Sequence, residues 1–230
     1  MSKGHDLPGH DPRGPVPAHP DFDTVPLPLW HRLTPGGVAG NARLTAAAGL
    51  VLLVLLFLEG LTLPAIRLLL VPHVFVGVLL IPPLALKLAS TGYRFIRYYT
   101  GNPHYRAAGP PHRVLRVLAP LLVVSVILLV GSGVLLLIVG PADDAWRRIH
   151  TLAFLAWFWI MTVHVLAYAP RAIRLAWRDR ATRGRNAVAG VLSRHVLIAG
   201  SLLLGTALAV AALPLAAAWV HVVGLDRGFR

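Results

Sequence analysis

Two histidines lie within one long apolar stretch of the sequence, residues 147–171. His150 and His164 are fourteen residues apart. In an α-helix, at about 100° per residue, this spacing brings both side chains to within about 40° of one face and separates them by roughly 21 Å along the axis. Ionisable side chains inside a membrane helix are costly and usually functional. Both histidines are therefore candidate metal ligands, at two depths of a bilayer about 30 Å thick.

A second apolar stretch carries residues that would face these histidines. His73 lies near the start of a predicted helix, 68–91, and Lys87 follows fourteen residues later. Because helices 68–91 and 147–171 would enter the membrane from the same side, we expect His73 and His150 to lie at the same depth. Two neutral imidazoles on facing helices are suitable axial ligands for a six-coordinate b-type haem.

Three glycines near this depth would let a flat macrocycle approach the helix backbones. Gly77 lies one turn after His73, and Gly131 and Gly133 form a small patch on a predicted helix, 114–139. The alternative for all three is helix packing, for which membrane helices also use small residues.

Other polar residues are candidate partners of these groups. A ligand histidine usually donates its second N–H to an oxygen, and Thr151, Ser125 and Thr162 are candidate acceptors. Glu59, near the far end of the first helix, has three interpretations: proton acceptor for a quinol, ion-pair partner of Arg67, or simple interfacial carboxylate.

The inner histidine, His164, has no obvious histidine partner at its own depth. Lys87 lies there instead, and His31, His112 and His195 at the membrane edge are poorly placed. The sequence therefore leaves the haem number open. With two haems, His164 would ligate the second. With one, His164 would contact a quinone or a haem substituent, and Lys87 would pair with a propionate.

The composition predicts an all-α membrane protein. Of the 230 residues, 56% are hydrophobic and 13% are charged, and few soluble domains are so apolar. The apolar residues form long blocks without the alternation of barrel strands. We expect a disordered, proline-rich cytoplasmic tail (1–40) and a transmembrane bundle of five helices (41–230), four of which form a haem-binding core. The predicted spans are 42–61, 68–91, 114–139, 147–171 and 196–220.

The net charge of +13 comes largely from arginines between the apolar blocks. With five spans, the basic loops 92–113 and 171–194 lie on one side, which the positive-inside rule assigns to the cytoplasm. The amino terminus is then inside and the carboxyl terminus outside, as in a multi-pass protein of the bacterial inner membrane. Arginines in this role argue against nucleic acid as a partner, although these loops would also suit anionic lipid or an acidic partner. The absence of cysteine excludes disulfides and thiolate-held clusters within this chain.

The chain resembles the prokaryotic cytochrome b561 and b-type cytochrome subunit superfamily, which includes the membrane anchors of formate dehydrogenases and nickel–iron hydrogenases. The resemblance covers about residues 41–222. It rests on VPHVFVG and RRIHTLAFLAWFWIMTVHVLAY, with further similarity in KLASTGYRFIRYYTGNPHYRAAGPP. It implies haem b ligation by His73, His150 and His164. It also implies electron relay between the quinone pool and a peripheral redox subunit, for example an exported molybdenum oxidoreductase. The family's histidine at the start of the first helix is absent here.

These observations favour an electron-transfer subunit over a complete enzyme. The alternative is a haem-free membrane protein, either a small transporter or an assembly factor, which would be colourless when purified. Broken helices near the midplane would support a transporter. Only the adjacent Pro82 and Pro83 indicate such a break.

Overall fold

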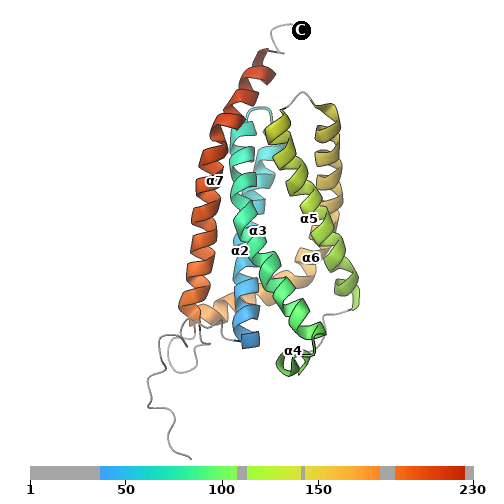
Figure 1. Cartoon of the computed structure of the whole chain (residues 1–230), viewed down its shortest axis with the longest axis vertical. Coiled ribbons are helices and arrows are strands. Elements are labelled where there is room, and N and C mark those ends of the chain that lie inside the picture. Colours follow the sequence, from blue (N-terminus) through green and yellow to red (C-terminus); the bar gives the residue numbers. More distant parts are fainter. Residues whose placement is uncertain (1–36, 108–112, 141–142, 182–189, 226–230) are drawn as a thin grey trace, which may run out of the picture.

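The computed structural model describes residues 37–107, 113–140, 143–181 and 190–225 (Figure 1). These residues form long helices joined by short connections, with no strand among them, which confirms the all-α prediction. Two short elements, the 3₁₀ turn η2 (Leu63–Ala65) and helix α4 (Pro103–Ala107), lie in connections. The long helices are α2 (Gly37–Thr62), α3 (Leu70–Tyr99), α5 (Arg113–Val139), α6 (Asp144–Ala181) and α7 (Val191–Leu225).

The described part of the chain contains 5 helices that are long and apolar enough to cross a membrane, which confirms the predicted number of spans. Their surfaces remain largely apolar, and large side chains such as Leu166 (75% exposed) and Leu203 (72% exposed) point outward. Helices that are apolar all round require an apolar solvent. The exposed leucines therefore indicate a surface in contact with lipid.

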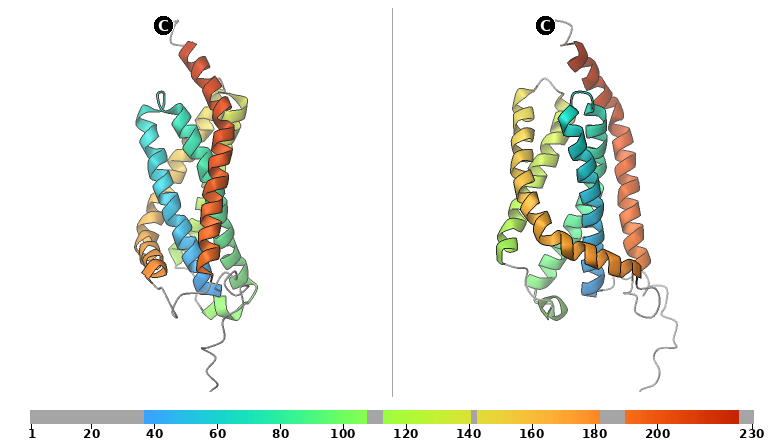
Figure 2. Two further views of the ribbon diagram at one scale, coloured as in Figure 1. Left: turned by 90° about the vertical axis from the view of Figure 1, so that its left-hand side faces the viewer. Right: turned by 180° about the vertical axis from the view of Figure 1, so that it is seen from behind.

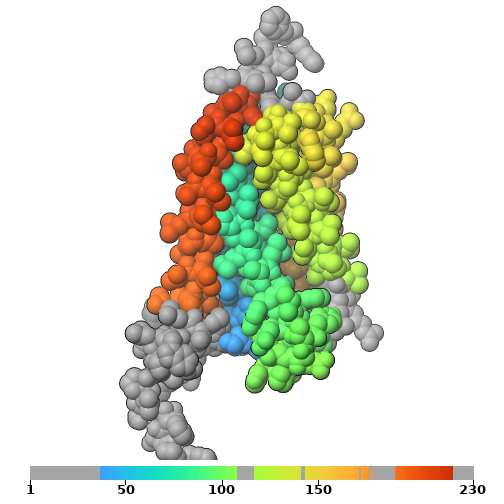
Figure 3. Space-filling model, viewed as in Figure 1, coloured from blue at the N-terminus to red at the C-terminus, as the bar shows by residue number. Residues whose placement is uncertain are grey.

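The helices pack in two groups. Helix α3 packs on α2 and α7, and α6 packs on α5 and also on α2. Figure 2 shows α7 on the side of the bundle away from α5 and the first part of α6, and Figure 3 shows the surface of α3 between those of α7 and α5. A small core of Leu52, Leu55 and Leu80 joins α2 to α3, with Leu202 of α7 against it.

Several helix ends differ from the predicted spans. Helix α2 begins at Gly37, within the predicted tail, while residues 1–36 of that tail lie outside the described residues. Helix α3 continues to Tyr99 and α6 to Ala181. Hydropathy marks only the membrane-spanning part of a helix, and a helix can continue beyond it. The last part of α6 runs across the lower end of the bundle (Figure 2), and Pro170 within this helix removes a backbone donor and permits the bend.

The two basic loops come together at one end of the bundle. Helix α4, in the connection from α3 to α5, lies at the same end as the start of α7, whereas η2 and the end of α7 lie at the opposite end (Figure 1). We call the end that carries α4 the basic end. This arrangement agrees with the predicted placement of loops 92–113 and 171–194 on one side, although residues 108–112 and 182–189 of these loops lie outside the described residues.

Candidate functional site

The structure brings His73 and His150 together near the end opposite the basic end. Their ring centroids are 6.5 Å apart and their planes are nearly perpendicular, at 86°. The two side chains come from α3 and α6, which pack mainly on other helices rather than on each other. The imidazoles therefore span the space between the two packing groups, at one depth.

The Nδ1 atom of His73 is held by two residues of the preceding helix. It lies 3.0 Å from Oε1 of Glu59 and 2.9 Å from Oγ1 of Thr62. The Thr62 hydroxyl donates to the backbone carbonyl of Glu59, so its oxygen is free to accept from the imidazole. Both neighbours are acceptors, which places the proton of a neutral His73 on Nδ1.

His150, on α6, is held in the same way by two residues of α5. Its Nδ1 lies 3.1 Å from the backbone carbonyl oxygen of Leu129 and 3.1 Å from Oγ of Ser132. The Ser132 hydroxyl donates to the same carbonyl. Because a carbonyl oxygen can only accept, the proton of a neutral His150 is also on Nδ1.

In both imidazoles Nε2 is therefore the unprotonated nitrogen of the neutral ring. In the described part of the chain, neither Nε2 atom has a hydrogen bond. In ligand histidines of proteins, one nitrogen likewise donates to an oxygen that fixes the ring, and the other binds the metal. The described residues supply no donor to either Nε2 atom.

The separation of the rings can be compared with that of two axial ligands. An imidazole nitrogen lies about 2 Å from a bound metal and its ring centroid roughly 1.1 Å further, so two rings on opposite sides of one ion have centroids about 6.2 Å apart. The 6.5 Å between His73 and His150 is close to this value. No group of three or more histidine, cysteine, aspartate or glutamate side chains suited to a metal occurs among the described residues. A haem would need only two ligands from the protein.

The three predicted glycines have different surroundings. A Cβ atom on Gly133 would lie 3.1 Å from Cε1 of His150, and one on Gly77 would lie 3.3 Å from Oε1 of Glu59. A Cβ atom on Gly131 would have no neighbour within 4 Å. Gly133 and Gly77 therefore make room for the histidine pair and its carboxylate. The expected patch of Gly131 with Gly133 does not form, because the two residues lie on different sides of α5.

The inner residues form a second polar region, nearer the basic end. Nζ of Lys87 donates to the backbone carbonyl of Thr45 at 3.1 Å, and Lys87 lies within electrostatic range of His164. The His164 ring packs on Tyr168, with centroids 4.7 Å apart. Tyr168 is thus the ring that contacts His164 among the described residues, and no histidine ring contacts it there.

The contacts of three side chains around the histidine pair were not predicted from the sequence. Glu59 contacts His73 and not Arg67, and Thr62 and Ser132 had no predicted role. Instead of contacting an imidazole, the three hydroxyls predicted as partners donate to carbonyls of their own helices: Thr151 to Arg147, Ser125 to Leu122 and Thr162 to Phe158. Thr62 lies three residues after Glu59, and Ser132 lies three residues after Leu129. This i, i+3 spacing was the only feature of the sequence that could have indicated their contacts.

No family model, curated protein or solved structure matches this chain. The functional argument therefore rests on the residues and their geometry.

Proposed function

We propose that the chain is a membrane b-type cytochrome subunit that binds haem b between His73 and His150 and relays electrons between the quinone pool and a partner oxidoreductase. The observation that carries the proposal is the arrangement of the two imidazoles. Each has its Nδ1 atom held by oxygen acceptors, and the ring centroids are 6.5 Å apart. Both Nε2 lone pairs are then available to one iron.

The protein's part is to hold and tune the site. When bound, haem b would supply a one-electron couple. Glu59 and Thr62 fix the His73 ring, Ser132 and the Leu129 carbonyl fix the His150 ring, and Gly133 leaves room for the latter. The Glu59 carboxylate places a negative charge beside one ligand, and this charge favours the oxidised form of the iron.

We propose one haem per chain. His164 has Lys87 and Tyr168 as neighbours, so a second haem would lack a histidine on its other face. Lys87 and His164 instead offer hydrogen-bonding groups to a quinone within the membrane. Lys87 is too far along α3 from His73, about 21 Å at the helical rise, to pair with a propionate of a haem held there.

The basic end supports an orientation in the membrane. By the positive-inside rule it faces the cytoplasm, which puts the amino terminus inside, the carboxyl terminus outside and the histidine pair near the outer face. A bacterial inner membrane and an exported partner, such as a molybdenum oxidoreductase, suit this orientation. The haem-free alternatives have less support, since α3 runs unbroken through Pro82 and Pro83, the one indication of a transporter.

The test is a dithionite-reduced minus oxidised spectrum of the purified chain, with a haem assay. We expect a b-type α-band and about one haem per chain. His73→Ala and His150→Ala should each abolish the α-band and the bound haem, because only one imidazole ligand remains in each variant. His195→Ala is the matched control, since this exposed histidine near the start of α7 lies far from the pair.

Two results would contradict the proposal. A colourless protein, after expression with adequate haem, would favour the transporter or assembly factor. Full haem content in both alanine variants would exclude this ligand pair while leaving haem binding elsewhere in the chain.

A further inference from the structure

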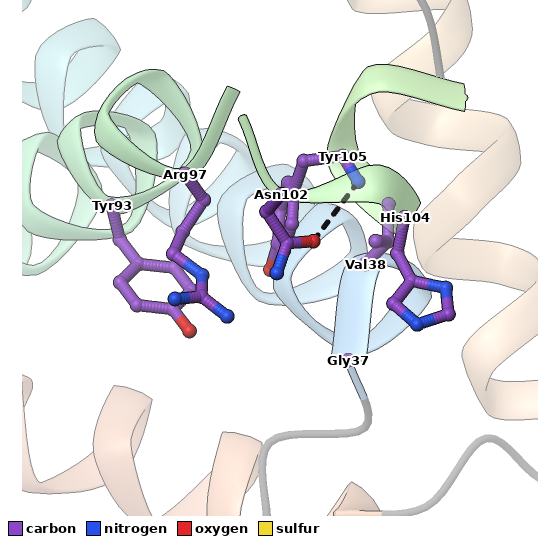
Figure 4. A pocket seen from close by; sticks show the side chains of 7 residues that line it. All are labelled: Gly37, Val38, Tyr93, Arg97, Asn102, His104 and Tyr105. Atoms are coloured by element: carbon purple, nitrogen blue, oxygen red, sulfur yellow. Dashed lines mark hydrogen bonds between the residues drawn. The ribbon is translucent and has the colours of Figure 1, made fainter. Parts of the chain in front are cut away.

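A pocket of about 470 Å³ lies at the basic end, far from the histidine pair. Four elements meet there: α2, α3, the turn after α3, and α4 (Figure 4). The lining residues are Gly37, Val38, Tyr93, Arg97, Asn102, His104 and Tyr105. The pocket combines groups that donate hydrogen bonds with aromatic rings.

The polar groups of the pocket suit a phosphate. The Arg97 guanidinium lies 5.9 Å from the centroid of the Tyr93 ring, one turn earlier on α3, which holds it by a cation–π contact. Oδ1 of Asn102 accepts from the backbone N–H of Tyr105, so the Asn102 amide keeps both of its N–H donors for a ligand. A planar guanidinium binds two oxygens of one phosphate at once.

The phenol of Tyr105 adds no negative charge to this pocket. Burial, chiefly, raises the pKa of Tyr105, and the neighbouring Tyr93 contributes in the same direction. The hydroxyl is therefore neutral at physiological pH.

Among the side chains that the structure describes, no carboxylate lies near these cations. The carboxylates whose side chains the structure describes are Glu59, Asp143 and Asp144, and all belong to the opposite end of the bundle, by η2 and the start of α6. Arg94 and Arg106 add to the positive charge near Arg97. The described part of the pocket is therefore basic and suits an anionic ligand.

The surroundings of the pocket favour lipid as the source of that anion. Phe95, Ile96 and Tyr99 lie at the level of Arg97 on other sides of α3, and they are 62%, 59% and 58% exposed. Aromatic side chains of this kind gather at the level of the lipid headgroups. They therefore place the pocket at the depth of the headgroups of that leaflet, where anionic lipid is concentrated.

We propose that this pocket binds the phosphate of an anionic phospholipid in the leaflet at the basic end. The Arg97 guanidinium, the Asn102 amide and His104 take the headgroup phosphate. Basic pockets between membrane helices on the cytoplasmic side bind acidic headgroups in this way. The inference does not depend on haem.

The experiment uses the purified full-length chain in mixed micelles with equal amounts of phosphatidylglycerol and phosphatidylcholine. Native mass spectrometry measures the lipid retained. We expect the wild-type chain to retain phosphatidylglycerol in preference, and Arg97→Gln to lower that retention about fivefold, the effect of one basic residue near an anionic surface. Arg97→Lys keeps the positive charge but loses the planar guanidinium, and its lipid retention should fall between those of the wild type and Arg97→Gln. His104→Gln, on a different element, should also lower retention.

The matched control is Arg67→Gln, which removes the same charge from an exposed arginine near η2 at the opposite end. Equal retention in the Arg97→Gln and Arg67→Gln variants would overturn the proposal, as would equal retention of the two lipids by the wild-type chain. Displacement of phosphatidylglycerol by millimolar inorganic phosphate would overturn lipid as the source and leave a site for a free anion.

Discussion

The Nδ1 atom of His73 lies 3.0 Å from Oε1 of Glu59. A carboxylate on α2 thus contacts an imidazole on α3 across η2. The second carboxylate oxygen, Oε2, is buried and has no hydrogen-bond partner among the described residues. A buried charge with few partners acts strongly on its neighbour, because little solvent screens it.

We predict that Glu59→Gln raises the midpoint potential of the haem while leaving its amount unchanged. The carboxylate stabilises the more positive, oxidised iron, so its loss favours reduction. A shift on the order of 60 mV corresponds to about tenfold in a one-electron equilibrium. Redox titration measures it. Asp144→Asn, an exposed carboxylate paired with Arg147 near the same end, is the control and should shift the potential far less. Equal shifts would mean that only net charge matters.

The two glycines of α5 provide a matched pair of substitutions. In Gly133→Val the side chain meets Cε1 of His150, since even a Cβ atom would lie 3.1 Å away. If His150 holds haem as proposed, we expect haem content to fall severalfold, because the His150 ring must shift to make room. Gly131→Val imposes the same loss of helix propensity but meets nothing within 4 Å, and should retain its haem. A haem assay on both variants decides, and equal losses would exclude a specific role for Gly133.

Helices α3 and α7 make a close backbone contact at Gly205. A Cβ atom there would lie 2.5 Å from the backbone oxygen of Leu79, which cannot rotate away. We expect Gly205→Ala to destabilise the fold by about 1–3 kcal/mol, the usual cost of overpacking. Thermal unfolding in detergent measures the change. Gly200→Ala, on the same helix and with nothing within 4 Å, should have little effect. An unchanged melting temperature for Gly205→Ala would mean that α7 is free to move away from α3.

The inner histidine gives a test of haem number. Because its neighbours are Lys87 and Tyr168, we predict that His164→Ala leaves the haem content unchanged. The same variant should weaken reduction by a quinol, if the inner polar region receives it, and Lys87→Met should do so too. Loss of about half the haem in His164→Ala would instead reveal a second haem.

The orientation of the chain is testable because the sequence has no cysteine. Thr100→Cys and Ala145→Cys place one exposed thiol at each end of the bundle. A membrane-impermeant maleimide should label residue 145 in intact right-side-out vesicles, which expose the outer face. It should label residue 100 in intact inverted vesicles, which expose the cytoplasmic face. The opposite pattern would contradict the positive-inside assignment.

Much of the bundle was predictable from hydropathy, since each span is a continuous apolar block that stands out in a single sequence. The matching depths of His73 and His150 were predictable too, because depth depends only on position along the chain and direction of crossing. The ends of helices beyond the membrane were less predictable. Helix α6 extends to Ala181, where the hydropathy of the sequence no longer indicates whether the helix continues.

The rotation of each helix about its axis could not be predicted. It decides that Gly133 faces His150 while Gly131 does not, and that Ser132 is the hydroxyl at the imidazole. These assignments depend on how α5 and α6 pack, and apolar helices such as α5 carry little sequence asymmetry to indicate a face. Likewise, Glu59 reaches His73 only because the turn at η2 is tight.

That turn has a consequence for biogenesis. Helices α2 and α3 with η2 form a hairpin of near neighbours in sequence, and the contact of His73 with Glu59 and Thr62 lies wholly within it. Membrane insertion proceeds from the amino terminus, so the His73 ring can be oriented once residue 99 has been made. His150 belongs to α6 and arrives later. If the pair binds haem as proposed, capture would be a late step in assembly, and a chain that stops before α6 would insert in the membrane without haem.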